Sequence, residues 1–542
     1  METIILNNNL IAENEALKIE ISALKANLAE VESQLSWLLE QLSSNRRKMF
    51  GVSSEKGANI FDDAQMRLFE DNATEVITFN SADVSTTDSP PKNRPKKRGE
   101  MRSRLPEGLP VETIKCELPE EQRSCPECND MTNSIGKEVV RRELKIIPAK
   151  AVIVEYERES YACPNGCEKV SDKSDDLVPI IIKAELPPQV IKGSMCAPET
   201  VAHIITQKCV MGVPVHRQAQ DWNRNGIPIN KQTMYSWMIR CSEDYLEPIY
   251  DEKHVQLCKH KFLHSDGTTF QVLDEPGKTP QSESCMWVYR TSGDAEQPIV
   301  LYDYKPDKRQ ERPREFLKGF SGYLMTDGSS SYNDLPDEII LVGCFAHVRS
   351  KFFDAIKVIQ KDEDRVGSLA SVGLKYCDDL FDIEREIKEK SFDERYTVRN
   401  RDASPILDKF HAWLLSVQPY VAPKSKIGKA INYALKQWKF LIRYLLDGRI
   451  EISNLRCERT VKPFVINRKN FLFASSVAGA RAAAVFHSIT ETAKESQLNP
   501  FEYLSHIFRT AAGIYLRENH DMLISLLPEN APPSCRVPKL KK

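Results

Sequence analysis

Two stretches decide the fold of this chain: Leu263-His264-Ser265-Asp266-Gly267-Thr268-Thr269 and Tyr323-Leu324-Met325-Thr326-Asp327-Gly328. In each, an apolar run typical of a β-strand meets an aspartate beside a glycine, a pattern that predicts a turn. A third acid, Glu458, lies far downstream in a stretch that favours a helix. Mg²⁺ prefers carboxylate oxygens and keeps part of its shell for water and phosphate. Two aspartates and one glutamate held together therefore indicate a two-metal phosphoryl-transfer site that acts on DNA.

Length and charge limit the classes of protein to consider. A chain of 542 residues exceeds what one core usually holds, so several domains are expected. The formal net charge of -2 excludes a uniformly basic coat for nucleic acid, but basic residues cluster between Lys92 and Arg104 and again around Glu458. No secretory signal and no apolar run of about 20 residues is found, which predicts a reducing, cytoplasmic compartment.

The N-terminal part predicts a dimerisation helix over residues 1–50, followed by a flexible basic linker over 51–104. Its apolar positions alternate in steps of four and three, as in a coiled coil, and Asn14 at an a position favours a parallel homodimer. A single amphipathic helix packed on its own domain is the alternative. The linker is either a solubilising tether or an arm that contacts phosphate. The apolar seam comprises Leu10, Leu17, Ile21, Leu24, Leu28, Val31, Leu35, Leu38 and Leu42.

Residues 105–185 contain two cysteine pairs and predict a zinc-ribbon-like module. The pairs are Cys125-x-x-Cys128 and Cys163-x-x-x-Cys167, with a strand-like segment over 145–158 between them. Close pairs aim two thiolates each at one ion, so four cysteines would complete a structural Zn²⁺ site without an open position. In a reducing compartment such pairs indicate metal rather than disulfides.

Residues 186–258 predict three short helices, over 198–208, 216–224 and 231–241. The last two are joined by a short turn, which makes them a helix-turn-helix candidate for DNA binding. The polar start of the third helix, Lys231, Gln232 and Thr233, would then contact bases. An ordinary helical bundle with Tyr235 and Trp237 in its core is the competing interpretation.

The rest of the chain predicts a ribonuclease-H-like α/β catalytic core, so the whole is a multidomain α+β protein. Three antiparallel strands, a helix, and then alternating strands and helices form its first part, 259–353. This order places Asp266 and Asp327 on neighbouring central strands. A helical insertion, 354–449, with a break near 419–424, separates this part from the second, 450–515, which carries Glu458; residues 516–542 are expected to form a C-terminal tail.

Several side chains near Glu458 fit a DNA-processing site. Arg459, Lys462, Arg468 and Lys469 would neutralise backbone phosphates, so binding would weaken with salt. His347, three residues after Cys344, would orient DNA or a water, or else be a buried hydrogen-bonded histidine.

Taken together, these motifs resemble a DDE-type transposase of the insertion sequence 66 family, over nearly the whole chain. The resemblance rests on His264-Ser265-Asp266, Thr326-Asp327-Gly328, Gly343-Cys344-Phe345-Ala346-His347, and above all Cys457-Glu458-Arg459-Thr460-Val461-Lys462-Pro463 through Asn467-Arg468-Lys469-Asn470-Phe471-Leu472-Phe473. It implies that Asp266, Asp327 and Glu458 are catalytic and hold two Mg²⁺ ions, with Mn²⁺ as a substitute. It also implies zinc at the four paired cysteines, element ends and target DNA as substrates, and a nucleoid-associated prokaryotic protein with accessory partners from the same element.

The sequence departs from this family ahead of the glutamate. The family has an Asp-Asn-Asn run where Ser453-Asn454-Leu455 stands here, and Ser453 is expected to cap the helix that carries Glu458. Three alternatives to a transposase remain. They are an inactive sequence-specific DNA-binding regulator, a nuclease that cuts without joining, and, least favoured, a zinc hydrolase, for which no set of histidine and carboxylate ligands with an open position is evident.

Overall fold

The computed structural model describes residues 181–359 and 365–538, short pieces before them (150–162, 165, 168–170 and 177–179), and Lys18 and Thr113. It divides into two units, and residues 188–537 belong to the larger one. The predicted coiled coil, apart from Lys18, the predicted basic linker and all four cysteines predicted to bind zinc lie outside the described residues.

The smaller unit contains two antiparallel strand pairs, β1 with β4 and β2 with β3. Residues 150–159 have no regular structure, so the strand expected over 145–158 is wrong in its described part, and a strand begins only at Ser160. The strands are β1 (Ser160–Ala162), β2 (Glu168–Val170), β3 (Leu177–Pro179) and β4 (Ile181–Lys183).

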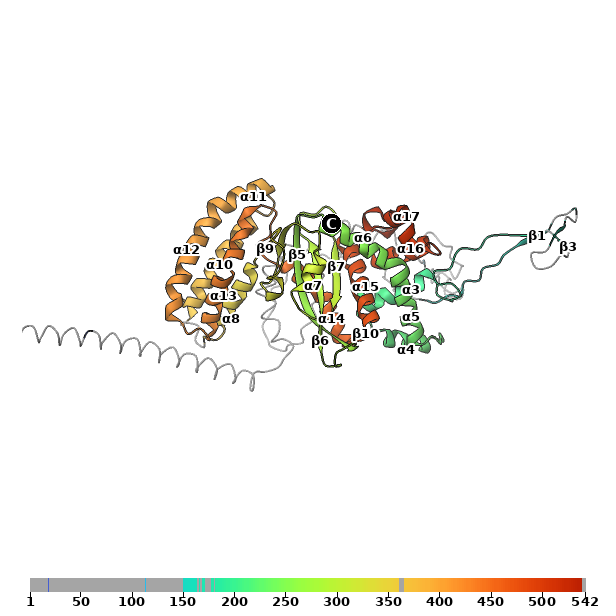
Figure 1. Ribbon diagram of the computed structural model, residues 1–542, viewed down its shortest axis with the longest axis horizontal. Helices are drawn as coiled ribbons and strands as arrows, with labels where there is room; N and C mark the ends of the chain where they lie inside the picture. Colours follow the sequence, from blue (N-terminus) through green and yellow to red (C-terminus); the bar gives the residue numbers. More distant parts are fainter. Residues whose placement is uncertain are drawn as a thin grey trace, which may run out of the picture. The chain divides into compact units, whose positions relative to one another are not determined.

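A mixed sheet is the centre of the larger unit (Figure 1). Its strand order is β7-β6-β5-β8-β9; β5, β6 and β7 pair antiparallel, whereas β8 and β9 continue the sheet in parallel. A short strand, β10, pairs in parallel with the far end of β5. The three antiparallel strands and the adjacency of the strands near Asp266 and Asp327 are confirmed. The strands are β5 (Phe262–Asp274), β6 (Glu283–Thr291), β7 (Val300–Lys305), β8 (Gly322–Met325), β9 (Ile339–Val342) and β10 (Ala474–Ser476).

One group of helices precedes the sheet in sequence, yet shares a core with helices from the end of the chain. Val201, Ile204 and Met238 are buried with Ile489, Phe508 and Leu526 in this core. Residues 516–535, expected in a tail, belong to it because their leucines are buried there. The helices are α3 (Pro198–Cys209), α4 (Val215–Arg224), α5 (Lys231–Cys241), η5 (Ser242–Leu246), α6 (Glu247–Cys258), α15 (Val477–Glu495), α16 (Pro500–Ala511), η10 (Leu516–Glu518), α17 (His520–Ser525), η11 (Pro528–Asn530) and η12 (Pro533–Cys535).

The helical insertion packs at the β9 side of the sheet, as Figure 1 shows. Phe352, Phe410 and Ala434 form its core, and Met325 and Val342 connect this core to the sheet. The predicted break is confirmed, since no α-helix covers 418–425. The helices are α8 (Phe345–Ile356), α10 (Leu369–Glu386), α11 (Phe392–Val398), η7 (Arg399–Ala403), α12 (Ser404–Val417), η8 (Gln418–Tyr420), α13 (Lys426–Leu441) and η9 (Ile442–Leu446).

The two faces of the sheet are covered differently. On one face Leu263, Trp287 and Leu324 pack near α7 (Glu311–Phe316) and η6 (Ser330–Tyr332). On the other, Phe270 and Val288 pack against α14 (Leu455–Phe471) and α15. Because side chains alternate along a strand, Asp266 shares the second face with Phe270. The strand and the helix that carry two of the predicted acids therefore meet on one face.

Candidate functional site

Register places the two predicted aspartates level with each other. Strands β5 and β8 run parallel, with His264 opposite Met325. Asp266 and Asp327 each lie two residues beyond this pair, so a parallel register carries them side by side at the end of β8. The pairing explains how residues from distant parts of the sequence reach one place.

Asp266 does not lie at a turn, contrary to the expectation from its glycine neighbour. Strand β5 runs through it to Asp274, and Asp266 pairs with Val288 of β6. A Cβ on Gly267 would lie 3.1 Å from the Trp287 ring, so the glycine there makes room for packing. The Gly267 N–H donates to Asp266 Oδ1 over 2.7 Å and fixes one carboxylate oxygen.

Asp327 does lie at a turn, and the helical insertion supports it. Gly328 has a φ of +81°, which favours glycine, and the Ser329 N–H donates to Asp327 Oδ1 over 2.9 Å. From α13, the Tyr433 hydroxyl donates to the Asp327 carbonyl over 2.9 Å. A Cβ on Gly328 would lie within 2.8 Å of Gln437 atoms, so the same helix packs closely on the turn. The insertion thus positions a predicted catalytic residue.

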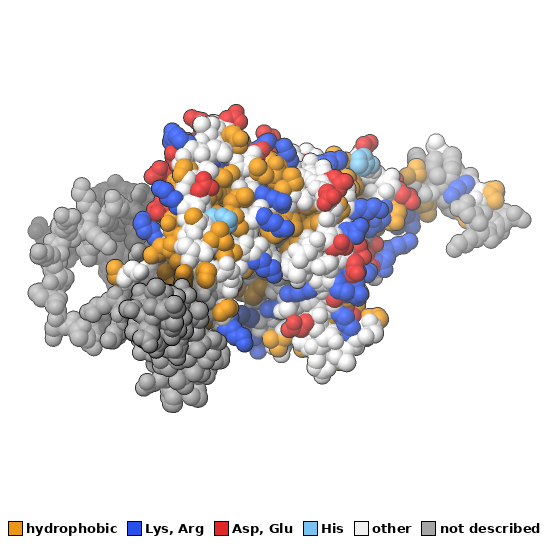
Figure 2. Space-filling model, turned by 60° about the vertical axis from the view of Figure 1, so that its left-hand side comes forward, with side chains coloured by type: hydrophobic (Ala, Val, Ile, Leu, Met, Phe, Trp, Pro, Cys, Tyr) orange, Lys and Arg blue, Asp and Glu red, His pale blue; other side chains and the backbone are white. Residues whose placement is uncertain are grey.

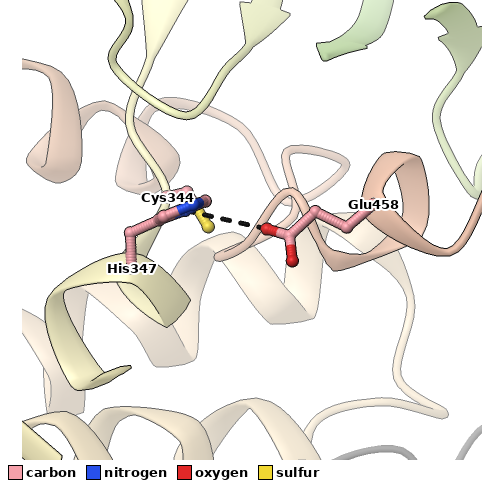
Figure 3. Close-up of side chains that lie close together, drawn as sticks. All are labelled: Cys344, His347 and Glu458. Atoms are coloured by element: carbon pink, nitrogen blue, oxygen red, sulfur yellow. Dashed lines mark ion pairs between the residues drawn. The ribbon is translucent and has the colours of Figure 1, made fainter. Parts of the chain in front are cut away.

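Glu458 lies in the first turn of α14 and points toward His347 of α8, as Figure 3 shows. His347 Nδ1 is 3.7 Å from Glu458 Oε1, and neither atom has a hydrogen-bond partner although both are buried. Cys344 completes a group in which its Sγ, a His347 ring nitrogen and a Glu458 carboxylate oxygen all lie within 4.8 Å of one another. Over the described ranges this is the one group of three such ligands, so Asp266, Asp327 and Glu458 do not form another that compact.

The acids of the site influence one another electrostatically. Burial, followed by repulsion from Asp327 and Glu458, raises the pKa of Asp266 to about 6. Burial and then Asp327 raise the pKa of Glu458, against the opposing effect of Lys462 and Arg459. Burial lowers the pKa of His347, which leaves the imidazole neutral near pH 7. A divalent cation would relieve this repulsion, so the donor set fits one.

Asn454, at the start of α14, contacts both β5 and Cys344, the residue before α8. Its Nδ2 donates to the Ser265 carbonyl of β5 over 2.9 Å, and its Oδ1 lies 3.0 Å from His264 Nδ1. Since a carbonyl only accepts, Nδ2 must be the donor, and Oδ1 then accepts from a protonated Nδ1. Its backbone N–H donates to Cys344 Sγ over 3.1 Å. Asn454 is fully buried, and the sequence reasoning gave it no such role.

The cap expected for α14 is wrong. Asn454, rather than Ser453, occupies the N-cap position, and no side chain caps the helix there. The reason is that the Asn454 amide is committed to β5 through Ser265 and His264. The helix start is thus held by tertiary contacts instead of a local cap.

The predicted DNA-binding residues differ in their surroundings. Arg459, Lys462 and Lys469 are exposed and recur at helical spacing along one side of α14. Arg468 instead donates from Nη1 to the Thr269 carbonyl of β5, which gives it a structural contact.

The start of α5 is partly available for contact with a ligand. Lys231 and Gln232 are exposed, while the Thr233 N–H donates to Asn230 Oδ1 and caps the helix. Trp237 is buried in the helical core, as the bundle interpretation expects, whereas Tyr235 is 38% exposed.

Known proteins are similar in sequence to this chain over most of its length. The uncharacterized proteins y4jD and y4hP of Sinorhizobium fredii (strain NBRC 101917 / NGR234) are 28% and 26% identical to the chain. The first similarity covers 95% of this chain and 97% of the relative, the second 88% and 86%. None of the helices in the described residues is long and apolar enough to cross a membrane.

Three family models match successive parts of the sequence. One described as a zinc-finger binding domain of transposase IS66 matches residues 122–168, a range that holds all four paired cysteines. One described as Transposase C of IS166 homeodomain matches residues 37–114. The model of the Transposase IS66 family matches residues 193–482, which include the sheet, the insertion and Glu458. Because this last match covers more than half of the chain, the chain belongs to the IS66 family of transposases.

Proposed function

We propose that this transposase binds the terminal inverted repeats of its element, hydrolyses a phosphodiester at each end, and joins the freed 3′-hydroxyl to target DNA. The observation that carries the proposal is the parallel register of β5 and β8, which brings Asp266 level with Asp327 on the face covered by α14. The strand order β7-β6-β5-β8-β9 supports a ribonuclease-H-like core.

Asp266, Asp327 and Glu458 would hold the divalent cations, with Mg²⁺ as the expected metal. Their mutual repulsion and the buried, unpartnered Oε1 of Glu458 support this assignment. When bound, two such ions supply Lewis acidity to the attacking oxygen and neutralise charge on the leaving oxygen. Hydrolysis and joining then need no covalent enzyme intermediate, because each exchanges one phosphodiester oxygen for another.

The protein's own residues would orient the DNA and the carboxylates. Tyr433 and the Gly328 turn hold Asp327, and the Asn454 network holds β5 and α14 together. The exposed stripe of Arg459, Lys462 and Lys469 beside Glu458 would bind backbone phosphates. Neutral His347 is suited to orient a water or a hydroxyl by accepting its proton in a hydrogen bond.

Other contacts with DNA would come from the helices outside the core. The start of α5 at Lys231, Gln232 and Thr233 would contact the terminal repeats. Lysines on α13, such as Lys429 and Lys436, are exposed. On the face drawn in Figure 2, basic side chains lie among apolar and acidic ones. This surface would restrain the cleaved end.

Assembly and metal content complete the proposal. The heptad seam within residues 10–42 would join two chains, so that each dimer handles both ends of the element. Cys125, Cys128, Cys163 and Cys167 would bind one Zn²⁺ in the segment matched by the zinc-finger model. Accessory proteins of the element would join the complex on DNA near the nucleoid.

The test is a strand-transfer assay with labelled duplex ends of the element, target DNA and Mg²⁺. Intact protein is compared with Asp327→Asn and with Asp337→Asn, a matched control at an exposed acid beside β9. Joined product with the intact protein and the control, but not with Asp327→Asn, is expected. Cleavage without joining would indicate a nuclease, and binding without cleavage would indicate a DNA-binding regulator; either would contradict the proposal.

A further inference from the structure

A compact group of three potential metal ligands lies beside the predicted magnesium site. Cys344 Sγ, a His347 ring nitrogen and a Glu458 carboxylate oxygen lie within 4.8 Å of one another, on two elements that are distant in sequence (Figure 3). Cys344 precedes α8, His347 lies in its first turn, and Glu458 comes from α14. Only Glu458 belongs to the proposed catalytic triad.

The spacing of these atoms fits a tetrahedral ion. Donors about 2.1 Å from a tetrahedral zinc are about 3.4 Å from one another, and a thiolate lies slightly farther out. The observed 3.7 Å between His347 Nδ1 and Glu458 Oε1 is close to this value. Small side-chain rotations would bring three donors onto one ion and leave the fourth position to water.

The donor atoms have few competing partners. Both Nδ1 and Oε1 are buried without a hydrogen bond, although burial of such atoms usually requires one. Cys344 is 1% exposed, and its Sγ accepts a hydrogen bond from the Asn454 N–H over 3.1 Å. A bound ion would satisfy the two orphaned atoms.

The ligand types select a different metal from the catalytic one. Thiolate and imidazole favour Zn²⁺ and related transition metals, whereas Mg²⁺ requires oxygen ligands. Such an ion would use Glu458, which the proposed mechanism assigns to magnesium. Zinc and magnesium would therefore compete for the Glu458 carboxylate.

We propose that Cys344, His347 and Glu458 form a Zn²⁺ site whose occupancy inhibits strand transfer. Binding releases the Cys344 thiol proton to solvent and involves no change of oxidation state. The inhibitory part rests on the proposed function, because it requires Glu458 to serve in catalysis; the metal site itself does not. Cellular zinc would then restrain transposition.

The first test counts zinc ions bound by the full chain. Intact protein, Cys344→Ser, His347→Gln and the control Cys377→Ser are equilibrated with Zn²⁺, freed of excess, and measured by mass spectrometry of the metal. Serine keeps an oxygen that accepts the Asn454 N–H but binds zinc poorly. Cys377 is a buried thiol on α10 that is not one of the three proposed ligands. The segment matched by the zinc-finger model is unchanged in all four proteins, so it adds the same number of zinc ions to each count.

The intact protein and Cys377→Ser are expected to bind one more ion per chain than Cys344→Ser and His347→Gln. Co²⁺ as a probe is expected to give a stronger thiolate charge-transfer band with the intact protein than with Cys344→Ser. Equal numbers of bound zinc ions in all four proteins would overturn the proposal of a zinc site at Cys344, His347 and Glu458. Circular dichroism identifies a variant that fails to fold, and the other variant then decides.

The second test measures inhibition in the strand-transfer assay. The Zn²⁺ concentration that halves joining, relative to each protein's own zinc-free activity, is expected to rise more than about tenfold in Cys344→Ser, since even outer-shell changes weaken metal binding by that factor. An unchanged concentration would overturn the inhibitory role. If no protein joins DNA, the proposed function fails, while the ion count still decides the metal site.

Discussion

Replacement of Asp266 by asparagine is expected to stabilise the magnesium-free protein while it abolishes strand transfer. Burial and the neighbouring Asp327 and Glu458 raise the pKa of Asp266 from 3.8 to about 6. The asparagine Oδ1 still accepts the Gly267 N–H, which is the one hydrogen bond resolved at this side chain. The substitution thus removes a charge and retains the local geometry.

The expected gain follows from the difference in pKa between the folded and unfolded states. A shift of about two units at about 1.4 kcal/mol each gives an upper value of about 3 kcal/mol at pH 7.5. The folded state holds the Asp266 proton more tightly than the unfolded state does. Its stabilising contribution is therefore complete below the unfolded pKa near 4 and is lost as the pH rises through about 6.

Urea unfolding in magnesium-free buffer, followed by tryptophan fluorescence, measures this gain. At pH 7.5 Asp266→Asn is expected to unfold at higher urea than the wild type, and at pH 4 the advantage should fall below about 1 kcal/mol. Asp274→Asn, at the exposed end of the same strand, is the control for removing a charge. Equal or lower stability of Asp266→Asn at pH 7.5, or an equal advantage at both pH values, would refute the electrostatic argument.

Three further predictions concern the surroundings of the acids. Asn454→Ala leaves His264 Nδ1–H and the Ser265 carbonyl buried without partners, which should lower the free energy of unfolding by about 2–6 kcal/mol in urea titrations. Its control, Asn470→Ala, removes one exposed hydrogen bond and should lower this free energy by about 1 kcal/mol or less. Lys462→Gln should weaken DNA binding and reduce its logarithmic salt dependence by about 1, measured by fluorescence anisotropy at several salt concentrations. Tyr433→Phe removes the hydroxyl that holds the Asp327 carbonyl, so joining should fall roughly tenfold while end binding is retained, measured by gel assays of both steps.

The sequence alone predicted those parts of the fold that depend on local pattern. Alternating apolar residues identified the three antiparallel strands, and the break near Pro419 in the insertion was predicted as well. The turn at Asp327 was also evident, because Gly328 supplies the positive φ that it requires. The same rule failed at Gly267, where the glycine makes room for Trp287 of the next strand. The two glycines are alike in the sequence, and the pairing of β5 with β6 continues the strand through Gly267.

The predicted site was incomplete for a related physical reason. The acids were found because carboxylates are chemically distinctive, whereas Asn454 and Tyr433 act through hydrogen bonds to backbone carbonyls in other elements. Such contacts leave no local pattern, since their partners are 106 to 189 positions away. The spacing Cys344-x-x-His347 was visible, but it acquires a third ligand only when α14 brings Glu458 to the start of α8.

The same geometry explains how the proposed active site can be divided between remote segments. Asp327 depends on a helix of the insertion, and Glu458 depends on a helix whose start is tied to β5 by Asn454. Without these contacts, the distances between the three carboxylates would not be fixed, because each carboxylate belongs to a different segment of the chain. Repulsion among the acids opposes their approach, as the raised pKa of Asp266 indicates. The buried hydrogen bonds of Asn454 and Tyr433 therefore stabilise an arrangement that the charges alone would disperse, and a bound cation would remove the remaining repulsion.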